Sequence, residues 1–485
     1  MKGFYITTAI DYVNSKPHLG HAYEKITADV VARWKRLESR DVFFLTGTDE
    51  NAQKNAMAAE RVGKNTQEFV NEMAENFKKL CKALNISNDY FIRTTEKRHV
   101  EIVQKIFQKL YDKGDIYKGE YEGLYCFSCE AFYLEKDLKD GKCPVHKTEP
   151  KRIKEESYFF RLSKYQEKLL EFLENNPEFI LPKTKRAEIL NRVKKGLKDL
   201  SVSRFNIDWG IPVPFDEKHK IYVWFDALLN YITALDYPDG EKYKKYWPCD
   251  YHFIGVDISW FHCVIWPCML MALDIPLPKH VFIHGFINIG GEKMSKSRGI
   301  FVDPFELVNK YGVDQVRYFL VRNIPFGEDG EFSEESLRER INGELVSDLG
   351  NLVNRVLAIV ERNPGVKFEG KPELENYLDF EKISQYMDKL ELHHALDAIW
   401  DFIRATNKYI NEKEPWKLKG EELSHVLYNL LESLRVISIL ISPFMPETSE
   451  KINEQLGIEA GTFKDLKFKK FEGNPKKGKI LFQKV

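Results

Sequence analysis

The sequence lacks the features that mark secreted, membrane-spanning and repetitive proteins. It opens with no charged-then-apolar leader. Its most apolar stretch, Cys263 to Leu273, is shorter than the ~20 residues that cross a bilayer and is interrupted by Pro267. It contains seven cysteines, and because nothing points to secretion, a disulfide framework is not expected. We find no internal repeat and no low-complexity tract. The sequence therefore predicts a soluble, cytoplasmic, globular chain with no membrane segment.

The sequence also has no excess of charge of one sign, because its 73 Lys and Arg residues are balanced by 74 Asp and Glu residues. A chain with this balance can still bind nucleic acid through local basic patches. Two segments could form such patches: Lys183, Lys185, Arg186, Arg192, Lys194, Lys195 and Lys198, and the lysine-dense tail from Lys464 to Lys484. A solvated surface is the alternative for both, and for the tail it is the preferred interpretation. A length of 485 residues fits about three domains at ~150 residues each.

The first motif, His18-Leu19-Gly20-His21, lies where a predicted strand leads into a predicted helix. Phe4 to Thr8 is rich in β-branched and aromatic residues, and apolar residues spaced by four, four and three mark one helical face between Ala22 and Ser39. Backbone N–H groups at a helix start attract anions, and Gly20 permits a close approach. Two imidazoles can donate to phosphate oxygens. The alternative is a helix cap with two surface histidines.

The second motif is the basic segment Lys293-Met294-Ser295-Lys296-Ser297, flanked by Gly290-Gly291 and Arg298-Gly299. Glycines on both sides predict a loop that can move. Its concentrated positive charge can close over a triphosphate and neutralise a departing pyrophosphate. A flexible basic surface loop is the simpler interpretation of this segment alone. Both motifs suit one ligand, a nucleoside triphosphate that is opened at its α-phosphate.

The cysteines predict a metal site. Cys126 and Cys129 are followed, after thirteen residues, by Cys143 and His146. In each pair the two ligands are separated by two residues, a spacing that forms a tight knuckle. Three thiolates with one imidazole suit a tetrahedral Zn²⁺ ion. Because four protein ligands close the coordination shell, the zinc is expected to be structural. A metal-free cluster of reduced thiols is the alternative.

The two motifs together resemble those of the class I aminoacyl-tRNA synthetases, and the chain resembles the methionyl-tRNA synthetase family along nearly its whole length. The stretches that carry this resemblance are Thr7 to Tyr12, Phe44 to Glu50, Asp208 to Pro214, Tyr222 to Ala227, Phe253 to Asp257 and Trp260 to His262. Their number and order argue against chance.

The predicted fold class is α/β, with a Rossmann-like parallel-sheet catalytic domain, a zinc-knuckle insertion, a connecting segment and a C-terminal α-helical bundle. Alternating strand and helix patterns support the parallel sheet. The expected domains are the split catalytic domain at 1–117 and 221–289, the inserted connective domain with the knuckle at 118–220, the lysine loop and stem-contact segment at 290–342, and the helical anticodon-binding domain at 343–485.

The resemblance implies a methionine–tRNA ligase. Its substrates are L-methionine, ATP with Mg²⁺, and tRNA(Met), and it forms methionyl adenylate before transfer to the terminal adenosine. Neither step needs a strong protein base, which is consistent with motifs built from His, Lys and Gly and with no recognisable Ser-His-Asp set. The residues implied to handle ATP are His18, Gly20, His21, Gly255, Asp257, Lys293 and Lys296; of these, His18, His21, Lys293 and Lys296 are the implied catalytic residues.

The resemblance also implies two recognition sites. The methionine pocket would use Ile10, Tyr12, Asp49, Trp224, Ala227, Tyr231, Ile258 and His262. Aromatic and aliphatic groups suit a thioether, and a carboxylate suits the α-ammonium group. Anticodon bases would be read by Asn351, Arg355 and Trp416. Core packing, a helix cap or a polar surface explains several of these residues individually.

Some positions depart from the family pattern. Asn51 stands where His is common, and Leu228 where Pro is frequent, so these departures lie at the rim of the implied methionine pocket. No C-terminal dimerisation module is recognisable, and a monomer is expected. Rival synthetases for Leu, Ile or Val usually carry a large editing insertion, and a cysteinyl enzyme would hold zinc at its amino-acid pocket. A small nucleotidyltransferase would lack the helical region, and a non-enzymatic tRNA-binding paralogue would lack the lysine loop.

Overall fold

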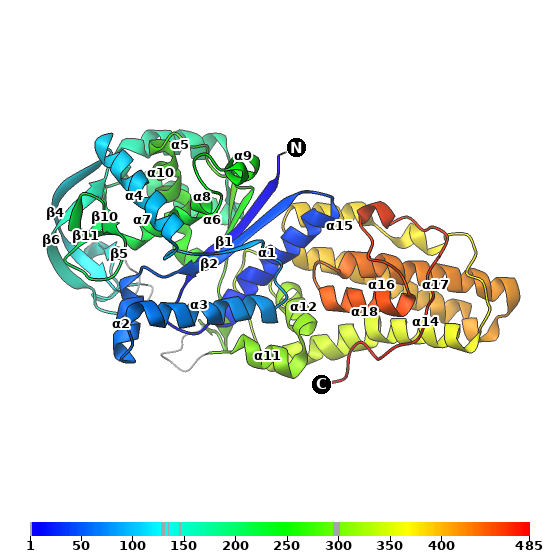
Figure 1. Ribbon diagram of the computed structural model, residues 1–485. Coiled ribbons are helices and arrows are strands. Elements are labelled where there is room, and N and C mark those ends of the chain that lie inside the picture. Colours follow the sequence, from blue (N-terminus) through cyan, green and yellow to red (C-terminus); the bar gives the residue numbers. More distant parts are fainter. Residues whose placement is uncertain (1, 128–130, 134, 145–146, 294–300) are drawn as a thin grey trace. The chain divides into compact units, whose positions relative to one another are not determined.

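The computed structural model describes residues 2–127, 131–133, 135–144, 147–293 and 301–485 (Figure 1). The chain divides into two compact units. The sheet unit comprises Met1–Pro17, Val42–Cys81 and Asn88–His284, and the helical unit comprises His18–Asp41, Lys82–Ser87 and Gly285–Val485.

A six-stranded parallel sheet organises the sheet unit, in the order β3-β2-β1-β12-β13-β7. From β1 the chain proceeds outward to β2 and β3 on one side, whereas the later strands β12 and β13 lie on the other side. The strands are short and mostly buried, as expected for a parallel sheet covered on both faces. Their bounds are β1 Phe4–Tyr12, β2 Val42–Asp49, β3 Tyr90–Arg93, β7 Ile180–Leu181, β12 Tyr251–Gly255 and β13 His280–His284.

Most helices of the sheet unit pack their apolar faces into one large core with this sheet, whereas α2 and α3 contribute Ala59, Phe69, Val70 and Phe77 to a second, smaller cluster. On α4, for example, Val103, Ile106, Phe107 and Leu110 are buried at helical spacing. The helices are α2 Gln53–Arg61, α3 Thr66–Ala83, α4 Lys97–Asp112, α5 Gln166–Asn175, α6 Lys183–Val193, α7 Val223–Leu228, α8 Asn230–Thr233, α9 Glu241–Tyr246 and α10 Trp266–Ala272.

Two antiparallel sheets follow α4 in the chain and lie, together with α5 and α6, almost entirely within the predicted insertion. One has the order β5-β4-β6-β8 and the other β10-β11-β9. The long β4–β6 pair runs from Ile116↔Phe160 to Tyr125↔Lys151, and Cys126 ends β4. Their bounds are β4 Ile116–Cys126, β5 Ala131–Tyr133, β6 Lys151–Phe160, β8 Leu200–Ser201, β9 Ser203–Phe205, β10 Pro212–Val213 and β11 Asp216–Ile221.

Helices dominate the helical unit, together with a small sheet in the order β15-β14-β16. Figure 1 shows α14, α16, α17 and α18 running alongside one another. The elements are α1 Leu19–Leu37, β14 Ile287–Ile289, β15 Glu292–Lys293, α11 Pro304–Tyr311, α12 Val313–Asn323, β16 Gly330–Glu331, α13 Glu334–Arg340, the π-helical η6 Ile341–Gly350, α14 Asn351–Arg362, α15 Phe380–Asp388, α16 Leu392–Lys413, α17 Gly420–Ile441 and α18 Pro446–Leu456.

A buried arginine on α12 ties three parts of the helical unit together. Arg317 pairs with Asp29 of α1 at 2.8 Å, and its guanidinium donates to the carbonyls of Leu84, Pro443 and Phe444. Both charged side chains are fully buried. Removing either partner would leave a buried charge without compensation, so this pair fixes the position of α1 within the unit.

Helix α17 is long and apolar enough to cross a bilayer, but 89% of its most apolar window is buried inside the protein. A helix that is apolar all round is expected at the centre of a bundle. Leu427, Leu434 and Leu440 are fully buried there, which identifies α17 as a core helix.

The predicted α/β fold with a parallel sheet and a helical C-terminal region is confirmed. The predicted first strand corresponds to β1 and the predicted first helix to α1. Leu345, Leu349, Leu352, Val356 and Val360 form a buried apolar face along η6 and α14. The zinc knuckle is a separate question, because Cys129 and His146 lie outside the described residues.

Candidate active site

The carboxyl ends of β1, β2 and β12 meet where the strand order reverses. In open α/β sheets ligands bind outside the carboxyl ends of the strands at this point. Ile10 lies near the end of β1, Asp49 ends β2, and Ile258 follows β12 closely. A bulge in β1 between Thr7 and Ile10 shifts its register against β2, and bulges of this kind re-aim side chains next to active sites.

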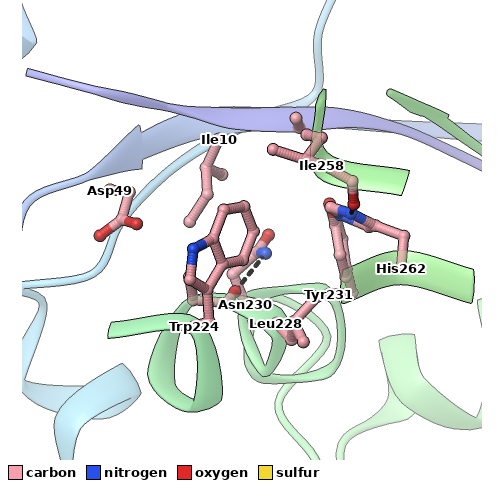
Figure 2. Close-up of a pocket in the computed structure, with 10 residues that line it drawn as sticks. Ile10, Asp49, Trp224, Leu228, Asn230, Tyr231, Ile258 and His262 are labelled. Carbon is pink, nitrogen blue, oxygen red and sulfur yellow. Dashed lines mark hydrogen bonds between the residues drawn. The ribbon is translucent and has the colours of Figure 1, made fainter. Parts of the chain in front are cut away.

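A pocket opens at this point of the sheet unit, with about 250 Å³ of space when its mouth is included. In the view of Figure 2, Asp49 lies at one side of it, and Tyr231 and His262 lie at the other. Its lining comes from the strand ends, from α7 and α8, and from the segment after β12: Ala9, Ile10, Asp49, Trp224, Ala227, Leu228, Asn230, Tyr231, Ile258 and His262.

Trp224 forms the aromatic wall of the pocket. Its ring stacks on Phe261 with the centroids 3.9 Å apart and the planes 9° apart. Tyr12 meets the same ring edge-on at 6.1 Å, so the predicted pocket residue Tyr12 supports Trp224 and is not itself among the lining residues. These contacts hold the indole in one orientation, which gives the pocket a rigid apolar side.

His262 is held in one neutral form by its two hydrogen bonds. Its Nδ1 lies 3.0 Å from the carbonyl of Ile258, which can only accept, so Nδ1 carries the proton. The hydroxyl of Tyr231 then donates to Nε2 across 2.7 Å. Burial lowers the pKa of His262 to about 4, so the ring is neutral at pH 7. The far wall of the pocket is therefore uncharged and polarisable.

A second buried histidine supports this wall from behind. The Trp266 indole donates to Nε2 of His252, so Nδ1 of that ring donates to the hydroxyl of Thr7 at 2.7 Å. Burial and the nearby His262 lower the pKa of His252 well below its ordinary value. The His252 ring lies 4.2 Å from the ring of Tyr231. Both histidines thus stay neutral and fix the tyrosine between them.

The Nε1 of Trp224 and the Oδ1 of Asn230 are buried in the lining and have no hydrogen-bond partner among the residues that the structure describes. An unpaired buried donor or acceptor costs about 1–3 kcal/mol. A polar ligand end can satisfy such atoms, so they favour a ligand that is polar at one end and apolar at the other.

The rim position Asn51 does not line the pocket but supports α7 from below. Its amide donates to the carbonyl of Thr94 at 3.0 Å and to a carboxylate oxygen of Asp226 at 2.8 Å. The other carboxylate oxygen of Asp226 lies 2.6 Å from Nε2 of His99. Leu228, the other departure from the family pattern, does line the pocket.

The His18-Leu19-Gly20-His21 motif begins α1 in the helical unit, and the two histidines cap that helix reciprocally. Nδ1 of His18 accepts from the backbone N–H of Gly20, and Nδ1 of His21 accepts from the backbone N–H of His18, both at 3.0 Å. The rings stack with their centroids 3.8 Å apart. Since each Nδ1 is an acceptor, the neutral rings carry their protons on Nε2. The motif is therefore both a helix cap and a pair of N–H donors.

Gly255 and Asp257 follow the carboxyl end of β12 in the sheet unit. A side chain at Gly255 would place its first carbon 2.8 Å from Oδ1 of Asp257 and 3.7 Å from the ring of His284. Asp257 is exposed. The glycine therefore keeps open the space beside an accessible carboxylate, which can accept hydrogen bonds from hydroxyl groups.

The basic segment follows a tight hairpin between β14 and β15. Gly290 and Gly291 both have positive φ, 60° and 76°, as the central residues of this hairpin turn require. Lys293 ends β15 and pairs with Asn288. The rest of the motif, including Lys296, lies outside the described residues.

Two of the four predicted zinc ligands lie in the described part of the chain. Cys126 and Cys143 are both buried, and both contact Thr148: the Cys126 sulfur lies 3.4 Å from its hydroxyl, and the Cys143 N–H donates to its carbonyl. The two cysteines thus converge on one residue. Among the described residues no group of three or more metal-binding side chains occurs, which is expected with Cys129 and His146 outside them.

The predicted anticodon residues lie on one surface of the helical unit. Asn351 begins α14, and Arg355 follows one turn later on the same helix. The Arg355 guanidinium lies 5.9 Å from the ring of Trp416 and donates to the side chain of Asn411 at 2.7 Å. Trp416 is 52% exposed. An exposed indole beside a guanidinium is a platform on which a nucleic-acid base can stack.

The sequence alone missed several residues of these sites. Ala9 and Asn230 line the pocket, Phe261 stacks on its tryptophan, and Asn411 holds Arg355. Phe261 and Asn230 each adjoin a predicted pocket residue in sequence, which is a usable signal. Asn411 lies 56 residues from Arg355, and nothing in the local pattern links the two.

Comparison with known proteins assigns the family. A model of the class I (M) tRNA synthetases matches residues 4–152 and 133–357, and a model of the anticodon-binding domain of tRNA ligases matches residues 378–481. The methionine–tRNA ligase of Caldanaerobacter subterraneus is 52% identical over the whole chain and 79% of its own length. The chain belongs to the methionyl-tRNA synthetase family.

Other relatives agree with this assignment. The methionine–tRNA ligase of Bacillus subtilis is 48% identical over 94% of this chain and 73% of its own length. The structure of the Mycobacterium tuberculosis methionyl-tRNA synthetase in complex with methionyl-adenylate matches with a TM-score of 0.95 at 41% identity, covering 99% of this chain and all of that one. The resemblance inferred from the sequence is confirmed. The chain is an ATP-dependent aminoacyl-tRNA ligase for methionine, and as a class I synthetase it uses Mg²⁺ with ATP.

Proposed function

We propose that methionine lies across the pocket with its α-ammonium group at Asp49 and its thioether against Tyr231 and His262. The supporting observation is the division of the pocket into a carboxylate at one side and a neutral aromatic wall at the other (Figure 2). A carboxylate forms a strong charge-assisted hydrogen bond with an ammonium group. A thioether is soft and makes favourable contacts with aromatic rings, such as that of Trp224. Ile10, Tyr12, Ala227 and Ile258 complete the proposed methionine site.

ATP is proposed to bind through both motifs. The Nε2–H groups of His18 and His21 donate to phosphate oxygens, and Gly20 admits the nucleotide to the start of α1. Gly255 and Asp257 hold the ribose, because an exposed carboxylate accepts from a diol. Lys293 and Lys296 neutralise the departing pyrophosphate, a charge that grows in the transition state.

The proposed chemistry consists of two displacements. A methionine carboxylate oxygen attacks the α-phosphorus, a P–O bond forms, and the bond to pyrophosphate breaks. A ribose hydroxyl of the terminal tRNA adenosine then attacks the methionyl carbonyl, its proton passes to a phosphate oxygen of the adenylate, and AMP leaves with the bonding electron pair. Positioning and charge stabilisation carry both steps. Mg²⁺ supplies charge neutralisation on the phosphates when it is bound with ATP.

Exchange between labelled pyrophosphate and ATP tests the activation step. We expect exchange that depends on methionine and does not respond to leucine or cysteine. Exchange that responds to leucine or cysteine but not to methionine would overturn the substrate assignment.

The lysine loop can be tested separately from methionine binding. Replacing Lys296 by Ala should slow adenylate formation by about 10²–10³-fold, the usual cost of losing one stabiliser of transition-state charge, and should leave methionine affinity nearly unchanged. The exposed Lys389→Ala variant of the helical unit is the control. An equal loss of rate and of methionine affinity would contradict the proposed role.

A structural zinc ion is proposed at Cys126, Cys129, Cys143 and His146. The convergence of two buried thiols on Thr148 supports it, because a thiolate pair of this kind suits Zn²⁺. Metal analysis of the purified chain should find one zinc per chain. Cys143→Ser should abolish it and Cys81→Ser should retain it; zinc retained in the Cys143 variant would refute the ligand set.

The anticodon of tRNA(Met) is proposed to bind at Asn351, Arg355 and Trp416. We call these three residues, together with Asn411, the Arg355–Trp416 surface.

The domain limits expected from the sequence remain predictions, with the catalytic domain at 1–117 and 221–289, the insertion at 118–220, the stem-contact segment at 290–342 and the anticodon domain at 343–485. A cytoplasmic location is proposed from the role of the family in translation. The expected monomer also stays a prediction, which light scattering on the purified chain tests.

A further inference from the structure

The basic helix α6 presents an arginine that is stacked next to the methionine pocket. The guanidinium carbon of Arg192 lies 3.9 Å from the centre of the Trp260 ring. In sequence, Trp260 stands between Ile258 and His262, which both line the pocket, although Trp260 itself is not among the lining residues. Arg192 is exposed, and among the described residues its side chain has neither an ion pair nor a hydrogen bond. Its planar group is therefore held in place by an aromatic ring while its N–H donors stay available.

Further positive charge continues from Arg192 along the same stretch of chain. Lys185 lies two helical turns before it and so projects from the same face of α6, while Lys195 and Lys198 follow in the turn after the helix, where both are exposed. Lys194 is paired with Glu174 at 3.0 Å. Glu188 and Asp137 also lie within electrostatic range of Arg192. The four other basic side chains, Lys185, Arg192, Lys195 and Lys198, still outnumber these two carboxylates.

We propose that Arg192, supported by Trp260, binds the single-stranded 3′ end of the tRNA and positions its last nucleotides at the methionine pocket. This inference rests on the proposed function, since it assumes that methionine is activated in that pocket. An arginine plane stacks well on a nucleic-acid base, and its N–H edge bonds to phosphate. The basic residues that continue beyond it match the charge of a polynucleotide backbone, which extends further than one nucleotide triphosphate.

The variant Arg192→Gln tests the proposal on the intact protein. We expect its methionine-dependent ATP–pyrophosphate exchange, measured without tRNA, to match that of the wild type. The single-turnover transfer of methionine from preformed methionyl adenylate to tRNA should fall about 10-fold, since stacking on one base contributes ~1–3 kcal/mol. Arg192→Lys keeps the charge without the planar group, and should restore the rate only in part.

A truncated substrate shows whether the effect belongs to the 3′ end. The wild type should bind intact tRNA(Met) more tightly than the same tRNA without its last three nucleotides, whereas the Arg192→Gln variant should bind the two equally. The matched control is Arg161→Gln, because Arg161 also stacks on an aromatic ring, that of Tyr117 at 4.4 Å, and lies outside the pocket lining. This control should retain the wild-type preference and transfer rate.

Three outcomes would overturn the proposal. If Arg192→Gln weakens the binding of intact and truncated tRNA equally, Arg192 contributes only general electrostatic attraction. An unchanged transfer rate would mean that Arg192 has no role in transfer. A loss of ATP–pyrophosphate exchange in step with transfer would place Arg192 in the activation step. Failure of the proposed function is a different result, in which the wild type itself shows no methionine-dependent exchange. Thermal unfolding midpoints within 1–2 °C of the wild type establish that the variants are folded.

Discussion

The proposed methionine pocket and the proposed anticodon site, the Arg355–Trp416 surface, differ most in how far their side chains are exposed. In the pocket, Tyr231 and His262 are each 1% exposed, whereas Trp416 is 52% exposed on the helical unit. In the proposed function the pocket encloses methionine, and several of its lining side chains, such as Trp224 and Tyr231, are also part of the core of the sheet unit. The Arg355–Trp416 surface is proposed to present an aromatic face and a guanidinium to the much larger tRNA.

This difference determines which properties a substitution changes. A change at a buried site that is also core alters both binding and the free energy of unfolding, because the same contacts serve both. A change at an exposed site away from the core usually alters stability by less than about 0.5 kcal/mol. The pocket is therefore expected to couple recognition with stability, and the Arg355–Trp416 surface to keep the two separate.

Within the comparison of pocket and surface, the largest effect is expected for Asp49→Asn. This change removes the buried charge that is proposed to pair with the ammonium group, and losing one partner of such a pair costs about 2–5 kcal/mol. The kcat/KM for methionine in pyrophosphate exchange should fall roughly 30-fold or more, with the affinity for tRNA unchanged. Glu60→Gln, an exposed acid on α2, is the control. A loss of less than threefold would show that Asp49 does not contact the ammonium group.

Trp416→Ala should sharpen the contrast from the other side. Base stacking on an aromatic side chain contributes about 1–3 kcal/mol, so the kcat/KM for tRNA should fall roughly 5- to 150-fold. Methionine-dependent exchange and the free energy of unfolding should stay at the wild-type value. Tyr377→Ala is the control, because Tyr377 is 64% exposed in the same unit. A Trp416 variant that loses stability as well would break the proposed separation.

Tyr231→Phe should change binding and stability together. Without the hydroxyl, Nε2 of His262 loses its donor in a buried site, at a cost of about 1–3 kcal/mol. The denaturant midpoint should fall and the KM for methionine should rise in the same variant. The exposed Tyr377→Phe should change neither. A normal midpoint with a raised KM would mean that the pocket, too, separates recognition from stability.

Much of the sheet unit could be predicted from local sequence patterns. The strand at Phe4 to Thr8 and the helix that follows the His18–His21 motif are set by residues close together in the chain, and the parallel arrangement follows from their alternation. The resemblance to the family supplied the pocket residues. The sequence predicts these strands, helices and pocket residues because short-range patterns and motifs shared with the family determine them.

Other features depend on contacts between distant residues and have no local signal. The place of β12 beside β1 brings together residues almost 250 positions apart, and this pairing creates the pocket. The pairs Arg355–Asn411 and Arg192–Trp260 are likewise tertiary contacts. The composition of α17 satisfies the length and hydropathy of a membrane span, and only its burial in the bundle shows that it is a core helix. From the sequence, a helix cap and a pair of donors to phosphate were alternative interpretations of His18 and His21. The reciprocal capping shows that the two are compatible, because it uses Nδ1 of each ring and leaves the proton on Nε2.

The smallest expected effect is a difference in pH dependence between the two regions. His262, with a pKa of about 4 when folded, and His252, lowered further below its ordinary value, are both neutral in the native protein. In the unfolded chain each titrates near 6.5. Between these pKa values the unfolded state binds more protons than the folded state. The contribution of these histidines to the free energy of unfolding is therefore fully present above pH 6.5 and is lost as the pH drops toward 4. The slope is about 1.4 kcal/mol per pH unit for each histidine once the pH is well below 6.5.

Because carboxylates also contribute to acid unfolding, the comparison between variants isolates this term. The free energy of unfolding, measured by denaturant titration at several values between pH 7 and 4.5, should fall less steeply for His262→Gln than for the wild type, by about 1 kcal/mol per pH unit below pH 6. Trp416→Ala changes no titratable group and should keep the wild-type slope. Parallel slopes for His262→Gln and the wild type would show that His262 is charged in the native pocket, and a neutral wall for the thioether would then have to be abandoned.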